Sequence, residues 1–483
     1  MFKNFSFLTF GRASGDFFNF LLFVLIARTF GQESIGHYSF AMALGGFCIA
    51  FADFGLYYLT IKELSHKVLP FGQSFASIWS LRIILAVSVT VALIFLTPFM
   101  PVSEHAQSLI LIIGISFIFG TLVDGFSAVF IAHENMQLAG LLDFSHRVTG
   151  ALTAIVVLLL GGNLFLAVGM LPIMAVVHSW GGYYLAKKRY GRLKLATSWS
   201  SVSKRFRSTI PYGLSELLGQ MAMRTNIVLL GFLLGTTAAG TYNVAYRIVF
   251  SLIFFSIFVR IILLPMASSL HTQDKDQLVA LYRNSLSLMV FFGLPTSCGI
   301  WLIAPDLIDL LYGKIYSESI PVLRILSALI FLFSVRNILG TFLTAVNLQS
   351  EKTKREAYGA LSIITGNLLL IPIWGVLGSA FATIGSEILL LVLFIMPLSS
   401  ILGWPGIGRT IVRSGIACFS FIVPFLFFST APLFAKVLVS IFLYFATLFL
   451  FTEVRQNELP KFWKLFRNSP RRTIPATEGN CQP

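Results

Sequence analysis

Long apolar stretches separated by short polar ones run through the whole chain. The stretches 148–186 and 357–386 contain no Asp, Glu, Lys or Arg, and each is long enough for two crossings of a bilayer at about 20 residues per crossing. The alternation of apolar and polar residues at every second position that a membrane β-barrel needs is absent from the sequence. The pattern therefore predicts an all-α polytopic membrane protein.

Short polar breaks divide these stretches into about fourteen predicted transmembrane helices. Turns such as Gly161-Gly162-Asn163 are so short that the helices they join must be antiparallel neighbours. The predicted spans are 7–29, 36–58, 78–99, 108–131, 147–161, 164–186, 210–234, 241–265, 285–304, 320–347, 356–373, 376–398, 410–428 and 432–452.

The composition supports this class and excludes several others. Charged residues make up 11% of the chain and mean hydropathy is +0.84, whereas soluble domains carry about 25% charged residues. The first span is not expected to be a cleaved signal peptide, because Arg12 and Asp16 interrupt its apolar run. The four cysteines are scattered, so neither a disulfide framework nor a metal site is expected.

The positive charges predict the orientation in the membrane. Most Lys and Arg residues between spans fall in loops that follow even-numbered spans, and the C-terminal tail adds six more. On the other side the sequence places only Arg28, Lys314 and Lys436. The positive-inside rule therefore predicts that both termini lie in the cytoplasm. This asymmetry also explains the net charge of +15, so no nucleic-acid partner is expected.

A repeated motif indicates an internal duplication. The pattern G-x4-G-x-Y-x2-A occurs at Gly31–Ala41 and again at Gly235–Ala245, 204 residues later. Such a repeat in a very apolar chain is typical of transporters built from two similar halves. We expect two pseudo-symmetric six-helix lobes around a central cavity. The predicted parts are an N-lobe (1–187), a basic cytoplasmic linker (188–209), a C-lobe (210–400), two appended helices (401–452) and a cytoplasmic tail (453–483).

The basic segment Lys187–Arg207 joins the two predicted lobes. We interpret it as an orientation signal and a linker. The alternative, which the sequence leaves open, is an interfacial helix that lies on anionic headgroups.

Two predicted helices carry a polar stripe on one face. Arg12, Asp16 and Asn19 stand at i, i+4 and i+7 in the first span, and Glu216, Gln220 and Arg224 stand at i, i+4 and i+8 in the seventh. A charge at a helix centre costs about 2.5–3.5 kcal/mol on insertion scales, so such residues normally face a cavity or a partner. The offset of 204 places Arg12 on Glu216 and Asp16 on Gln220. We expect both faces to line one cavity, although Arg12 and Asp16 could instead neutralise each other.

The candidate cavity residues are more basic than acidic. Arginine binds phosphate oxygens in a bidentate manner, so this balance favours an anionic group such as a phosphate or pyrophosphate. A cation-coupled drug exporter would instead be expected to centre on carboxylates. The predicted substrate-binding residues are Arg12, Asp16, Asn19, Glu216, Gln220, Arg224, Arg247, Arg260 and Arg336.

Two segments resemble one family of bacterial transporters. Leu25–Tyr38 is similar to the first hairpin of bacterial polysaccharide (O-antigen) flippases, and Met223–Ile248 is similar to their seventh and eighth helices. This family belongs to the multidrug/oligosaccharidyl-lipid/polysaccharide exporter superfamily. Asn226 departs from the pattern, because an acidic residue is common there in relatives, and this leaves a cation-coupling role of that position in doubt.

The resemblance implies a function and a set of partners. It implies that the chain moves an undecaprenyl-diphosphate-linked oligosaccharide from the cytoplasmic to the periplasmic face of the inner membrane by alternating access. O-antigen, capsule and exopolysaccharide precursors stay open as cargo, as does coupling to H⁺, Na⁺ or the membrane potential. Membrane lipids and other glycan-assembly membrane proteins are the further partners implied, and no cofactor is expected.

Three other functions were weighed. Lipid II as cargo and cation-coupled multidrug export share the predicted architecture. A glycan polymerase or ligase would need a sizeable external loop, but the longest predicted one, Pro305–Ser319, is short and contains no histidine. We therefore expect a transporter and not an enzyme.

Overall fold

The computed structural model describes the backbone of residues 2–65, 71–191, 198–427 and 432–451. The side chains of 2–13, 71–74, 426 and 449–451 lie outside the described part, and so does the predicted tail 453–483.

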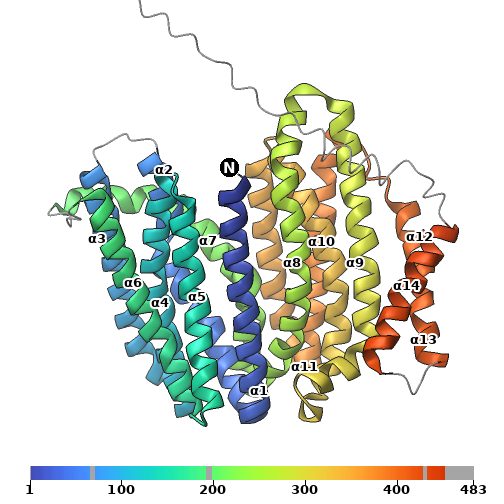
Figure 1. The fold of residues 1–483 in the computed structure, drawn as a ribbon, viewed down its shortest axis with the longest axis horizontal. Coiled ribbons are helices and arrows are strands. Elements are labelled where there is room, and N and C mark those ends of the chain that lie inside the picture. Colours follow the sequence, from blue (N-terminus) through green and yellow to red (C-terminus); the bar gives the residue numbers. More distant parts are fainter. Residues whose placement is uncertain (1, 66–70, 192–197, 428–431, 452–483) are drawn as a thin grey trace, which may run out of the picture. The chain divides into compact units, whose positions relative to one another are not determined.

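Every regular element in these ranges is a helix, and they contain no strand (Figure 1). The elements are α1 (Phe2–Asp53), α2 (Leu56–Ser65), α3 (Phe71–Leu96), η1 (Thr97–Phe99), α4 (Glu104–Ala132), α5 (Met136–Leu159), α6 (Leu164–Tyr190), α7 (Trp199–Leu233), α8 (Thr236–Gln273), α9 (Lys275–Leu311), η2 (Lys314–Tyr316), α10 (Ser319–Ala345), α11 (Gln349–Leu402), α12 (Gly408–Cys418), η3 (Phe419–Phe421), α13 (Ile422–Phe427) and α14 (Leu433–Phe451).

Glycines mark the points where two predicted spans join within one long element. α1 contains the first two spans and breaks at Gly31, where φ is 79°; α11 contains spans eleven and twelve and breaks at Gly375, where φ is 59°. Residues with a Cβ rarely adopt this left-handed conformation, so glycine allows the chain to turn here. Gly235, the repeat partner of Gly31, also has a positive φ, of 93°.

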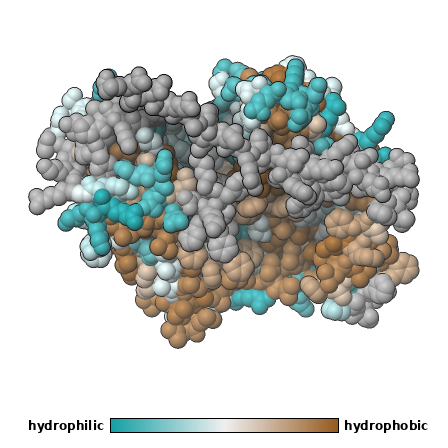
Figure 2. All heavy atoms as spheres, turned by 45° about the horizontal axis from the view of Figure 1, so that its top comes forward, coloured by the Kyte–Doolittle hydropathy of each residue, from teal (hydrophilic) through white to brown (hydrophobic). Residues whose placement is uncertain are grey.

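The prediction of an all-α polytopic membrane protein is confirmed. Nine helices in the described part are long and apolar enough to cross a membrane. α7 is not among them, and its polar stripe accounts for the lower hydropathy. Figure 2 shows broad apolar surface along the described helices, as expected where lipid replaces water.

Residue contacts divide the chain into two compact units. The first comprises Met1–Leu252, Ile300–Leu329 and Thr353–Leu390; the second comprises Ile253–Gly299, Ile330–Lys352 and Leu391–Pro483. Within the first unit α1 packs on α4, α5 and α7, and α4 packs on α6 (Figure 1). These boundaries differ from those of the predicted lobes, because the first unit adds α7 and parts of α8–α11 to the predicted N-lobe. The division into lobes stays a prediction.

A buried ion pair joins two helices of the first unit. Arg82 of α3 has no exposed surface, and its Nη1 lies 2.7 Å from Oδ1 of Asp53 at the end of α1. The same guanidinium donates to the Thr121 carbonyl of α4, while Asp53 Oδ2 accepts the Tyr57 N–H at 3.1 Å. Each charge therefore depends on the other, because Arg82 is fully buried and Asp53 is largely buried.

Removal of one partner of this pair should strongly destabilise the fold. Arg82→Met leaves the Asp53 carboxylate buried without its counter-charge, which we expect to cost about 3–5 kcal/mol of unfolding free energy. Asp53→Asn should cost a similar amount, and the double variant should cost clearly less than the sum. Denaturant unfolding in detergent micelles measures all three. Strictly additive effects would show that the pair contributes no coupling.

Candidate functional site

Three side chains of α7 form a hydrogen-bonded row. Gln220 Nε2 donates to Glu216 Oε1 at 2.9 Å, and Arg224 Nε donates to Gln220 Oε1 at 2.7 Å. Their spacing of four residues stacks them on one face of the helix. Gln220 separates the carboxylate from the guanidinium, so the row holds Arg224 in place without a direct Glu216–Arg224 ion pair among the described contacts.

Arg224 also reaches across to α1. Its Nη1 donates to the Met42 carbonyl at 2.7 Å. Gly46, one turn further along α1, makes this approach possible, because a Cβ at that position would overlap the Arg224 guanidinium. The contact joins the predicted C-lobe to the predicted N-lobe within the first unit.

Arg247 of α8 lies on aromatic side chains of the same unit. Its Cζ stands 4.9 Å from the centroid of the Phe23 ring. Tyr38 and Tyr312 are within range of its charge, and their buried hydroxyls have no hydrogen-bond partner among the described residues. Arg224 and Arg247 are also within range of each other's charge. Both arginines are half-buried in the first unit.

The other predicted site residues lie elsewhere or are not described. Asn19 donates back to the Gly15 carbonyl of its own helix at 2.8 Å, and Asp16 is exposed on α1. Arg260 and Arg336 belong to the second unit, where Arg260 is exposed and Arg336 lies over the Phe333 ring at 4.6 Å. The side chain of Arg12 lies outside the described residues. The structure therefore brings together Glu216, Gln220, Arg224 and Arg247.

The two copies of the repeated motif contact each other within the first unit. A Cβ on Gly36 would collide with the Thr236 carbonyl, and one on Gly240 would collide with Gly36, so the two backbones touch. Next to this contact Asn243 Nδ2 donates to Ser39 Oγ at 2.9 Å, and both side chains are buried. Gly36 with Gly240 and Ser39 with Asn243 are pairs at the offset of 204. Equivalent positions of the repeated motif therefore lie against each other.

The chain is similar in sequence to a known protein family. Residues 1–271 match the family described as polysaccharide biosynthesis protein, which is more than half of the chain. The chain belongs to this family.

Two curated relatives cover most of the chain. The capsular polysaccharide biosynthesis protein CapF of Staphylococcus aureus is 23% identical over 400 residues, which is 81% of this chain and 98% of that protein. A putative O-antigen transporter of Escherichia coli K12 is 25% identical over 403 residues, which is 80% of this chain and 92% of that protein.

The fold also has a solved counterpart. A structure of the lipid II flippase MurJ in an inward closed conformation superimposes with a TM-score of 0.75 and 14% identity, covering 91% of this chain and 97% of that chain. Together the family and the fold place the chain among multi-pass membrane transporters and not among enzymes.

A buried polar network that the sequence did not reveal lies in the same unit. Asn226 Nδ2 donates to the Tyr242 hydroxyl at 2.7 Å and to Thr383 Oγ1 at 2.9 Å, and its Oδ1 accepts from Asn367 at 2.7 Å. Ser379 Oγ donates to Asn367 Oδ1 at 2.6 Å. Of these residues the sequence pattern singles out Asn226 alone, as a departure from relatives. The available signal was Asn367, a lone amide in an uncharged apolar run.

Asn226 holds this network together, so its loss should destabilise the fold. Asn226→Leu keeps the branched shape of the side chain but removes one acceptor and two donors, and we expect a loss of about 1–3 kcal/mol. Thr365→Val, whose hydroxyl bonds only its own helix carbonyls, should change stability by less than about 0.5 kcal/mol. Unfolding in detergent compares the two; equal effects would contradict a special role of Asn226.

Proposed function

We propose that the protein is a flippase for a lipid-linked oligosaccharide whose diphosphate binds at Arg224 and Arg247. The cargo is an undecaprenyl-diphosphate-linked glycan unit, a precursor of O-antigen, capsule or exopolysaccharide. It moves from the cytoplasmic to the outer face of the inner membrane, and both termini of the protein lie in the cytoplasm. Family membership and the names of the relatives support the substrate class.

The observation that carries the proposal is the arginine pair. Two like charges within range of each other in an apolar unit repel, and each costs about 2.5–3.5 kcal/mol to place at bilayer depth. Neither makes an ion pair with a described residue. A bound diphosphate would relieve both costs, because its oxygens accept several charge-assisted hydrogen bonds at once.

The polar side chains near Arg224 and Arg247 suit the remaining polar groups of the proposed cargo. The unpartnered hydroxyls of Tyr38 and Tyr312 can donate to phosphate oxygens beside Arg247. Glu216, Gln220 and Asp16 can bind sugar hydroxyls, and the polyprenyl chain stays in lipid. We expect α12–α14 to offer that chain a groove. Arg12, Asn19, Arg260 and Arg336 remain further candidates for contact with the cargo.

Transport then requires alternating access. The contact of Gly36 with Gly240 holds the two motif hairpins together, and it must separate when the binding site opens on that side. The Asn243–Ser39 hydrogen bond must break with it. Gln32 Nε2 also donates to Thr241 Oγ1 at 3.1 Å between the two motifs, so this bond must break as well.

Loss of either arginine should impair export. Arg224→Ala and Arg247→Ala each remove a charged contact to the diphosphate, which should slow glycan export about tenfold or more. Surface glycan in a complemented deletion strain, at equal membrane abundance, measures this. Wild-type export by both variants would contradict the proposal, and so would a deletion strain with intact glycan but raised drug susceptibility.

The Gly46→Ala variant distinguishes the effect of the position of the Arg224 guanidinium from the effect of its charge. It keeps Arg224 but forces its guanidinium away from Met42, so export should fall although the charge is unchanged. Gly169→Ala is the matched control, because a Cβ on Gly169 meets no atom.

A crosslink between the motif hairpins should stop transport. In Ser39→Cys/Asn243→Cys the two thiols replace groups that are in hydrogen-bond contact, so oxidation should join the hairpins and reduction should release them. Export should be lost with an oxidant and recover with a reductant, while each single variant should be insensitive. Undiminished export by a fully crosslinked protein would show that the hairpins need not separate.

A further inference from the structure

Helix α7 is longer than one crossing of a membrane needs. The helix has 35 residues, a length of roughly 50 Å at 1.5 Å per residue, whereas the hydrocarbon core is about 30 Å thick. The surplus lies at the N-terminal end, because Lys204, Arg205 and Arg207 are there. This end of α7 therefore runs at the level of the lipid headgroups.

One face of this extension is fixed to the first unit. Val202 and Thr209 are buried, and Arg205 forms an ion pair with Glu63 of α2. Arg205 Nε also donates to Ser77 Oγ of α3 at 3.1 Å. The opposite face is therefore held in one orientation.

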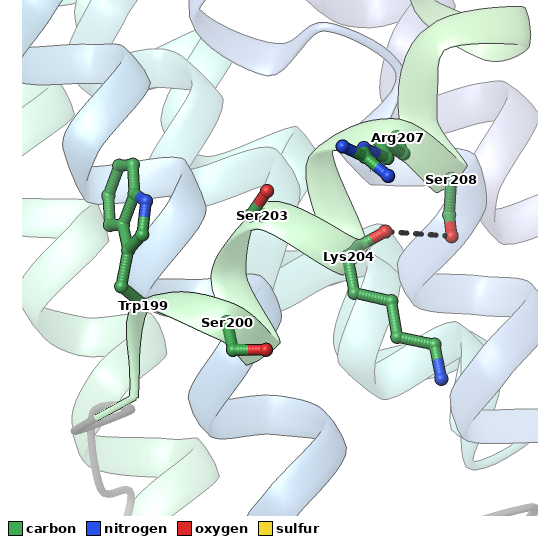
Figure 3. Close-up of a pocket in the computed structure, with 6 residues that line it drawn as sticks. All are labelled: Trp199, Ser200, Ser203, Lys204, Arg207 and Ser208. Atoms are coloured by element: carbon green, nitrogen blue, oxygen red, sulfur yellow. Dashed lines mark hydrogen bonds between the residues drawn. The ribbon is translucent and has the colours of Figure 1, made fainter.

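That opposite face forms a pocket with a volume of about 540 Å³. Two adjacent rows line it, each with a spacing of four residues: Trp199, Ser203 and Arg207, and Ser200, Lys204 and Ser208 (Figure 3). Ser208 Oγ donates to the Lys204 carbonyl at 3.1 Å, and the Lys204 side chain extends away from the helix. Neither Lys204 nor Arg207 forms an ion pair with a described residue.

Exposed apolar side chains continue from the pocket toward the membrane. Ile210 and Leu214 follow Arg207 along α7 and are exposed by 38% and 53%. Trp199 is exposed by 71%, and an exposed indole is typical of the membrane–water interface. The surface thus offers cations and hydroxyls at headgroup level and apolar contacts just below.

We propose that this pocket binds the headgroup of an anionic phospholipid. Lys204 and Arg207 contact the phosphate, the serine hydroxyls donate to its oxygens, and the acyl chains run along Ile210 and Leu214. Charge complementarity and the adjoining apolar track favour a lipid over a soluble phosphate, which would leave that track uncovered. This site is separate from the proposed transport site and does not depend on it.

Lipid binding to the purified full-length protein tests the proposal. Native mass spectrometry in neutral detergent gives the Kd for added phosphatidylglycerol and for phosphatidylcholine. We expect tighter binding of phosphatidylglycerol. In Lys204→Gln/Arg207→Gln the first phosphatidylglycerol should bind about 30-fold more weakly, since two basic contacts are lost. Lys204→Arg/Arg207→Lys should bind as the wild type does, which shows that the fold is intact.

A charge-matched control variant distinguishes binding at this pocket from diffuse electrostatic attraction of the lipid to the protein. Lys275→Gln/Arg409→Gln removes two exposed basic residues elsewhere and should change the Kd by less than about twofold. Equal weakening of phosphatidylglycerol binding in both double variants would overturn the proposal. Equal affinity of the wild type for phosphatidylcholine, or binding of inorganic phosphate and not of the lipid, would also overturn it. Displacement of phosphatidylglycerol by short-chain polyprenyl diphosphate at a much lower concentration than that of the lipid would assign the pocket to the cargo and also overturn the proposal.

Discussion

The constraint on which the first unit depends is the cost of placing a guanidinium among apolar helices. Three arginines meet it in three ways. Arg82 has a full counter-charge in Asp53, Arg224 has a carbonyl and an amide oxygen, and Arg247 has the face of an aromatic ring. Neutralisation decreases in this order, because an aromatic face contributes about 0.5–2 kcal/mol whereas a buried ion pair loses 3–5 kcal/mol when it is broken. The least compensated charges are those available to a ligand.

The glycines of the repeated motif serve the same unit in a different way. At Gly31 and Gly235 the backbone turns with a positive φ, and at Gly36 and Gly240 the absence of a Cβ lets two backbones touch. One short motif therefore ends one helix and creates the surface on which its own copy packs. Contacts made by backbone and small side chains bury little apolar area, so they can form and break at low cost.

The sequence predicted the helices well because the bilayer imposes a simple rule on length and hydropathy. The stripe Glu216–Gln220–Arg224 could also be predicted from the sequence, since residues four apart share a helix face. Contacts between side chains of distant helices could not be predicted from the sequence. Asp53 and Arg82 are 29 positions apart on different helices, and nothing in their spacing indicates that they pair. Asn226, Asn367 and Thr383 lie on helices whose packing, and not whose sequence, brings them together. The positions of Arg260 and Arg336 could not be predicted either, because their charge alone does not show to which unit they belong.

Helix α7 carries cations at two depths, and the difference in medium separates their roles. Arg207 and Arg224 are 17 positions apart, which is roughly 25 Å along a helix. At the headgroup level water and salt screen a charge within about 10 Å, so Lys204 and Arg207 act only on an anion that lies close to them. At the depth of Arg224 screening is slight and every unmet donor is costly, so a ligand must match the donors to be bound. A transporter that meets its cargo at a crowded anionic surface gains selectivity only where water is excluded. For the proposed function, the deeper arginines are therefore where an anionic cargo would be distinguished from the lipids around it.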